Sequence, residues 1–93
     1  MTTQRIAGTI GAQLLTWRKL LGLTAEQVAD RAGISRNTLR KLEKGDLGVG
    51  FEVFLDVARV LGLSEQLNIA FDPYETDFGR ARAEQKLPQR VRR

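Results

Sequence analysis

The chain has 93 residues, 42% of them hydrophobic and 28% charged, with a formal net charge of +4. This length suits one small domain with a modest hydrophobic core. The sequence contains no cysteine and no histidine, which excludes disulfides, thiolate metal sites and Ser–His or Cys–His catalytic pairs, and predicts a non-enzymatic protein without metal or cofactor.

The N-terminal segment, residues 1–15, has neither the charged start nor the long apolar run of a secretory signal. No stretch of the chain approaches the ~18 apolar residues that a membrane-spanning helix needs. We therefore expect a cytoplasmic protein that does not associate with a membrane.

The first helix is predicted over about residues 8–21. Three apolar residues share one stripe of it: Ile10, Leu14 and Leu21. Arg18 lies on the same face, and an inward arginine needs a partner of opposite charge. Trp17 and Leu20 occupy a neighbouring stripe, which is either the edge of the core or a partly exposed patch available to a partner.

Residues 24–45 predict two short helices joined by a tight corner. Thr24 is a good N-cap, and Gln27 stands where a capping box places Glu or Gln. Gly33 suits the left-handed position that ends a helix, and Ser35 starts the second helix as its N-cap. Ile34 is expected to fill the gap between the helices. The inward faces are apolar: Val28, Ala29, Ala32, Leu39 and Leu42.

The outward face of the second helix is polar and basic. Between residues 35 and 45, four cations outnumber one acid, Glu43. Arginine pairs with guanine and asparagine with adenine in the DNA major groove. A bare basic helix is usually only solvated, but the corner and both caps together predict a helix-turn-helix that binds DNA. The candidate DNA-contacting residues are Ser35, Arg36, Asn37, Thr38, Arg40, Lys41 and Lys44.

Beyond this hairpin, residues 46–50 form a loop that is either a phosphate contact or a plain connection. An amphipathic helix over 51–61 follows. Ser64 then starts a short last helix that turns Leu67, and with it Phe71, inward. Residues 46–72 carry five acids against one arginine, so this part of the domain is acidic where the second helix of the hairpin is basic.

Residues 73–93 form a tail that starts acidic and ends strongly basic, with six cations and one acid in 79–93. Gly79 and Pro88 argue against one continuous helix, so we expect a helix over 80–87 and an extended segment over 88–93. A solvated terminus, a contact with DNA phosphates and pairing with a partner chain are all consistent with this composition.

The chain resembles the phage repressor and Cro-type family of helix-turn-helix regulators over roughly residues 8–70. The matching residues are Leu23-Thr24, Val28-Ala29, Gly33-Ile34-Ser35, Leu39, Leu42-Glu43 and Gly45, with Arg18, Phe54, Ala58, Leu61 and Gly62 outside the hairpin. The resemblance implies an all-α, five-helix lambda-repressor-like domain over 1–72 with a short C-terminal tail over 73–93. It also implies DNA binding as a two-fold homodimer and an ion pair between Arg18 and Glu43.

The resemblance assigns base contacts to Arg36, Asn37 and Lys41, with Arg40 nearby, and phosphate contacts to Ser35 and residues 44–52. The family usually has glutamine at the second position of its second helix, where this chain has Ala25. One expected backbone contact is therefore missing, and the choice of DNA sequence should depend more on Arg36 and Asn37.

The leading hypothesis is a dimeric transcriptional regulator, expected to be a repressor, that binds an inverted-repeat operator in double-stranded DNA. The alternative is an antitoxin that neutralises a partner toxin and represses its own operon. The size of the chain motivates it, because a DNA-binding domain and a 21-residue tail leave no room for a ligand-sensing domain. The arrangement is similar to HipB-type antitoxins, although the tail carries no motif diagnostic of them.

Overall fold

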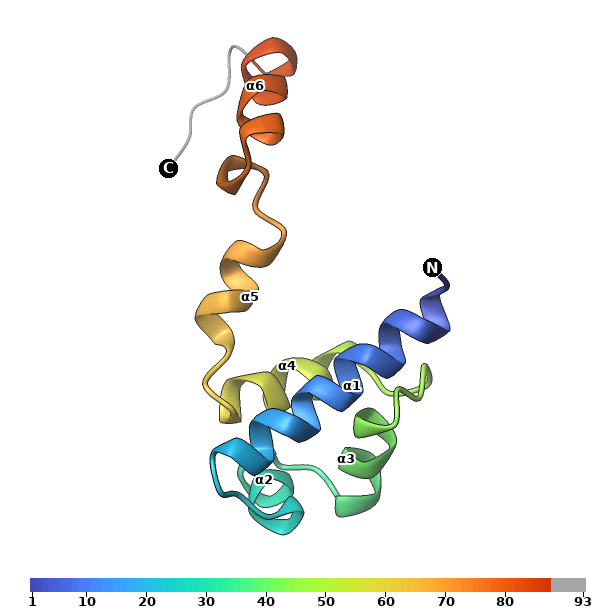
Figure 1. Cartoon of the computed structure of the whole chain (residues 1–93). Coiled ribbons are helices and arrows are strands. Elements are labelled where there is room, and N and C mark those ends of the chain that lie inside the picture. Colours follow the sequence, from blue (N-terminus) through green and yellow to red (C-terminus); the bar gives the residue numbers. More distant parts are fainter. Residues whose placement is uncertain (88–93) are drawn as a thin grey trace.

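The computed structural model describes residues 1–87, which are helical and contain no strand (Figure 1). The elements are α1 (Thr3–Leu20), α2 (Ala25–Ala32), α3 (Arg36–Glu43), α4 (Phe51–Val60), α5 (Ser64–Ala70), the short 3-10 helix η1 (Pro73–Glu75) and α6 (Asp77–Lys86). The all-helical fold predicted from the sequence is confirmed. The extended conformation predicted for 88–93 concerns residues outside those described.

α1 is longer at its N-terminus than the predicted helix over 8–21. Thr2 adopts an extended conformation, and its hydroxyl oxygen accepts a hydrogen bond from the backbone nitrogen of Arg5 at 3.1 Å. This N-cap satisfies one of the free amides at the start of a helix. The helix therefore begins at Thr3, and Gly8 and Gly11 lie inside it.

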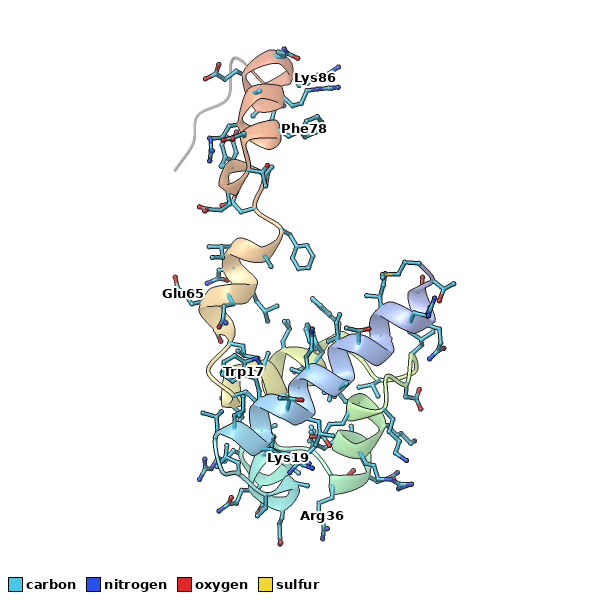
Figure 2. All side chains as sticks on the ribbon, in the orientation of Figure 1. Trp17, Lys19, Arg36, Glu65, Phe78 and Lys86 are labelled. Atoms are coloured by element: carbon cyan, nitrogen blue, oxygen red, sulfur yellow. The ribbon has the colours of Figure 1, made fainter. Side chains whose placement is uncertain are left out.

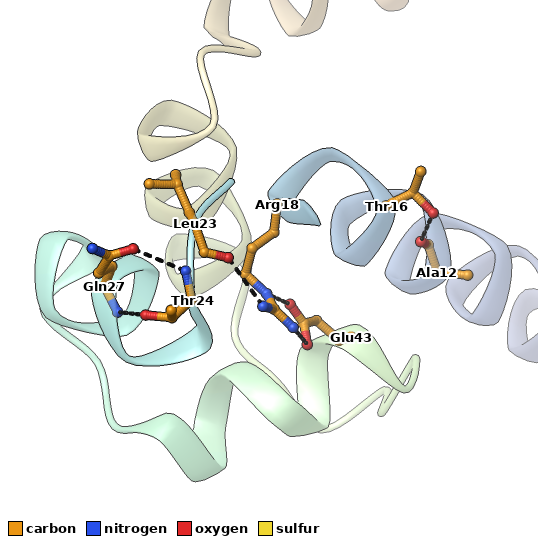
Figure 3. A network of polar contacts seen from close by, with 7 residues as sticks. All are labelled: Ala12, Thr16, Arg18, Leu23, Thr24, Gln27 and Glu43. Carbon is orange, nitrogen blue, oxygen red and sulfur yellow. Dashed lines mark hydrogen bonds and ion pairs between the residues drawn. The ribbon is translucent and has the colours of Figure 1, made fainter. Parts of the chain in front are cut away.

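The helical hairpin has the local structure that its sequence predicts. The hydroxyl of Thr24 accepts from the backbone nitrogen of Gln27 at 3.1 Å, and the side chain of Gln27 accepts from the backbone nitrogen of Thr24 at 2.9 Å (Figure 3). Gly33 has a φ of 72°, in the left-handed region where glycine is least strained. The capping box and the glycine corner of the sequence are thus both present.

The core lies where α1 to α4 meet. Val28 of α2, Leu39 of α3 and Val57 of α4 are its largest fully buried side chains. Ile34 packs against this cluster from the corner, as predicted. The other buried members come from the same four helices and the end of α4: Leu14, Ala29, Ala32, Leu42 and Leu61.

Several apolar residues expected to face the core are exposed. On α1, only Leu14 of the predicted stripe is buried. Ile10 is 37% exposed, and Leu21 is exposed because it is the C-cap residue, where the chain leaves the helix. Phe71 was expected to turn inward, but 86% of it is exposed because it follows the last turn of α5. Trp17 and Leu20 are 38% and 73% exposed, so their stripe of α1 fits the predicted exposed patch better than the predicted edge of the core.

α1 and the end of α3 approach each other at backbone distance. A Cβ atom at Gly11 would lie 2.6 Å from the carbonyl oxygens of both Leu42 and Glu43. A Cβ atom at Gly45, whose φ is 79°, would lie 2.6 Å from the Cα of Gly8. These glycines therefore set how closely α3 is held against the first helix.

η1 and α6 form a C-terminal arm, residues 73–87, at the far end of α5 from the four-helix body (Figure 1). The radius of gyration is 16.4 Å, whereas a compact domain of this length would have about 12 Å. α6 begins at Asp77 and includes Gly79, so the helix starts earlier than the predicted 80–87. Only glycine fits at position 79, because a Cβ atom there would overlap the carbonyl group of Pro73.

Candidate nucleic-acid interface

α3 is started by a tightly bonded N-cap. The Ser35 hydroxyl oxygen accepts from the backbone nitrogen of Thr38 at 3.0 Å and donates to the Thr38 hydroxyl at 2.9 Å. The Ser35 hydroxyl therefore uses its proton and one lone pair at the beginning of the helix, and the Thr38 hydroxyl uses one lone pair. Of the predicted contact residues, these two have the fewest hydrogen-bonding positions left for an added ligand.

The remaining predicted contact residues are all exposed on the outward face of α3. This set comprises Arg36, Asn37, Arg40, Lys41 and Lys44. Figure 2 shows Arg36 projecting away from the helical body. Within residues 1–87, no salt bridge or side-chain hydrogen bond engages any of the five. Four cations and one amide are thus available to bind an anionic partner.

Glu43 is the one acid of α3, and it points back into the fold. Arg18 Nε donates to Glu43 Oε2 at 2.8 Å, and a second guanidinium nitrogen donates to Oε1 at 3.3 Å (Figure 3). The same guanidinium donates to the carbonyl oxygen of Leu23 at 3.2 Å. The two side chains are only 14% and 11% exposed, so the expected ion pair is present and well shielded.

This ion pair gives α3 its electrostatic character. Because Arg18 neutralises Glu43, no acid on α3 offsets the cations of the outward face. The bidentate geometry also ties α3 to α1 and, through Leu23, to the turn before α2. The pair therefore orients the basic face as well as concentrating its charge.

A hollow of about 430 Å³ lies beside the start of α3. Its lining residues are Arg18, Ala25, Arg36, Asn37, Arg40 and Glu43. Ala25 contributes only a methyl group at the position where the resembled family has glutamine. The small side chain leaves the inner sides of Arg36, Asn37 and Arg40 open rather than braced by a neighbouring amide.

The loop over 46–50 uses several of its own amides. The backbone nitrogen of Gly48 donates to the Asp46 carboxylate at 2.7 Å, and those of Asp46 and Val49 donate to main-chain carbonyl oxygens. These amides are no longer free to hold a phosphate. The amides that open α4 have no side-chain cap, so a phosphate contact at the start of α4 stays a prediction.

The sequence analysis did not identify the residues of α1 that contact the end of α3. Gly8 and Gly11 looked like a glycine pair before a helix, but they lie within α1 and contact the end of α3. Gln4 adds a hydrogen bond from its side-chain nitrogen to the carbonyl oxygen of Gly45 at 3.3 Å. A three-residue glycine spacing on one helix face was the available signal, since it permits close helix packing.

Among the described residues, no helix is long and apolar enough to cross a membrane, and no group of three or more acidic side chains is placed to hold a metal ion. A helix-turn-helix family model matches residues 14–68, which is more than half of the chain. An uncharacterized HTH-type transcriptional regulator from Methanothermobacter thermautotrophicus is 44% identical over 45 residues. That match covers 48% of this chain and 65% of the relative, so slightly less than two thirds of the relative is spanned.

Proposed function

The chain belongs to the Cro-type helix-turn-helix family of DNA-binding proteins, and we propose that it is a transcriptional regulator that inserts α3 into the DNA major groove. The observation that carries this proposal is the unpaired, exposed basic face of α3, from which the only acid is withdrawn by Arg18. A helix in this position reads bases with the residues near its N-terminus. In α3 these residues are Arg36 and Asn37.

We assign base reading to Arg36 and Asn37, and backbone positioning to Arg40, Lys41 and Lys44. Arginine and asparagine each make bidentate hydrogen bonds with one base, which discriminate against other bases by about 1–3 kcal/mol. Lysine and arginine further along the helix neutralise phosphates without sequence preference. Ser35 and Thr38 hold the start of the helix. The Thr38 hydroxyl keeps its own proton for a phosphate, whereas Ser35 could donate to phosphate only by giving up its bond to Thr38.

We further propose that the protein acts as a repressor and binds an inverted repeat as a homodimer. Two recognition helices related by two-fold symmetry would read half-sites about 10 base pairs apart. A regulator that occupies promoter DNA is expected to block transcription by excluding the polymerase. A reporter gene behind the selected operator tests this, because expression should fall when the protein is supplied and would rise for an activator.

Selection from a random DNA library, followed by titration of the selected and a scrambled duplex, tests the DNA-binding proposal. Arg36→Ala and Asn37→Ala should each lower the ratio of specific to non-specific affinity by about 5- to 150-fold. Arg59→Ala is the matched control, because Arg59 is an exposed cation on α4 that pairs with Asp56 at 3.5 Å. The proposal is wrong if no sequence is enriched, or if both α3 variants retain the wild-type ratio.

The antitoxin role is a second candidate, favoured by one observation on the arm. Phe78 on α6 is 70% exposed, and exposed aromatic side chains are typical anchors for a protein partner. If a kinase-like protein is encoded beside this chain, the purified pair should form a complex that Phe78→Ser weakens. Retention of full affinity by that variant would exclude the arm as the binding segment.

A further inference from the structure

The hollow beside the start of α3 has the size of a small-molecule site. Three helices form it: α1 contributes Arg18, α2 contributes Ala25, and α3 contributes Arg36, Asn37, Arg40 and Glu43. Its volume of about 430 Å³ lies in the range of about 300–1,000 Å³ that is usual for ligand pockets. The hollow is therefore large enough for an organic molecule rather than for a single inorganic ion.

The charge of this hollow is positive, because its one acid is neutralised. Among the described residues that line it, only Glu43 is acidic, and both of its carboxylate oxygens accept from Arg18, at 2.8 and 3.3 Å. In the part of the chain that the structure describes, no acid pairs with Arg36 or Arg40. Two guanidinium groups at the hollow are thus left without a charged partner.

The spacing of these two guanidinium groups suits a shared anion. Arg36 and Arg40 are four residues apart on α3, which places their Cβ atoms about 5–6 Å apart on one face, where like charges repel each other. An anion between the side chains would remove this repulsion. Guanidinium groups bind phosphate with paired hydrogen bonds, and a phosphate monoester carries nearly two negative charges at neutral pH. Its charge therefore matches that of the two arginines.

Ala25 leaves the space for such a ligand and offers it an apolar contact. It is the first residue of α2 and packs partly against the core. Its methyl group has no hydrogen bond to give or accept, and the aliphatic stems of the arginines are also apolar. The organic part of a phosphate monoester can lie against this surface, whereas inorganic phosphate has no group to place there.

We propose that the hollow binds a small organic phosphate, held by Arg36, Asn37 and Arg40 with its organic part against Ala25. The ligand site rests on the hollow alone, but its consequence rests on the proposed function, because Arg36 and Asn37 are also the assigned base readers. The same donors cannot hold the ligand and a base at one time. The bound phosphate therefore competes with DNA and releases the protein from its operator.

Calorimetric titration of the DNA-free protein with phenyl phosphate tests the site by itself. One molecule should bind per chain, and Arg40→Ala should weaken its binding at least about tenfold, because a charged hydrogen-bond donor is lost. Arg31→Ala is the matched control, since Arg31 is an exposed cation on α2 that does not line the hollow. Equal losses in the two variants, or no saturable binding to the wild type, would overturn the site.

Ala25→Leu tests whether the ligand lies in the hollow, because leucine fills space there without changing the charge. This variant should bind phenyl phosphate at least about tenfold more weakly, since the organic part loses its place. The wild type should also bind inorganic phosphate more weakly than phenyl phosphate. Undiminished affinity in Ala25→Leu, or equal affinity for the two phosphates, would put the anion on the open face of α3 and contradict the proposal.

Displacement of the protein from its selected operator, followed by fluorescence anisotropy, tests the competition. Phenyl phosphate at ten times its own dissociation constant should raise the apparent dissociation constant for DNA about tenfold. Sodium chloride at the same ionic strength is the control for screening of the DNA contacts. Equal effects of the two salts would overturn the competition. If the protein binds phenyl phosphate but selects no DNA sequence, the proposed function fails and the ligand site stands.

Discussion

Gly8 and Gly11 lie three residues apart on α1, and alanine is expected to have opposite effects at the two positions. In a helix interior, alanine stabilises a protein by about 0.5–1 kcal/mol relative to glycine. A Cβ atom at Gly8 would meet no atom within 4 Å, so Gly8→Ala should gain this amount. At Gly11 the same atom would lie 2.6 Å from two backbone carbonyl oxygens of α3.

The cost at Gly11 follows from that distance. An ordinary contact of a Cβ atom starts at 3.4 Å, so α1 and the end of α3 would have to separate by about 0.8 Å. Overpacking costs about 1–3 kcal/mol, and the upper end applies because backbone oxygens cannot rotate away. After the gain in helix propensity, the net loss is about 2 kcal/mol. For a domain of this size, the midpoint of thermal unfolding should fall by roughly 8–16 °C.

Thermal unfolding followed by circular dichroism compares the two variants under one set of conditions. Gly8→Ala should unfold at a higher temperature than the wild type and Gly11→Ala at a lower one. Gly11→Ala should also weaken operator binding, since the shift moves α3 relative to its partner helix. A Gly11→Ala protein as stable as Gly8→Ala would refute the close approach of α1 and α3.

Arg18→Ala should cost about 1.5–3 kcal/mol in urea unfolding, because it leaves the shielded carboxylate of Glu43 without its charged donor. A double-mutant cycle with Glu43→Ala should then show coupling between the two, and strict additivity would contradict the ion pair. Lys44→Ala should weaken binding to all DNA sequences alike and reduce the slope of log affinity against log salt by about 0.9, measured by fluorescence anisotropy; an unchanged slope would remove Lys44 from the phosphate contacts. Ser35→Ala should cost about 1 kcal/mol of stability as a lost N-cap, whereas Ser35→Asp should keep the cap and selectively weaken DNA binding; equal DNA affinity of the aspartate variant and wild type would place Ser35 away from phosphate.

The sequence alone determined the features that depend on neighbouring residues. Thr24, Gln27, Gly33 and Ser35 specify caps and a corner through bonds that span only a few positions, and each forms as predicted. The basic outward face of α3 followed from helical periodicity, because the apolar residues of a short helix must face the core. The Arg18–Glu43 ion pair could also be predicted, since the family resemblance identified the partner of an inward arginine.

Tertiary structure decided which apolar surfaces are covered and how closely the helices meet. Periodicity placed Leu21 and Phe71 on inward stripes, but the chain leaves each helix there, so both are exposed. It also could not show that Gly11 faces the α3 carbonyl oxygens or that α6 projects from the body, because both depend on contacts between residues far apart in the chain. Burial and close approach are properties of the assembled helices, whereas caps and charge patterns belong to single segments.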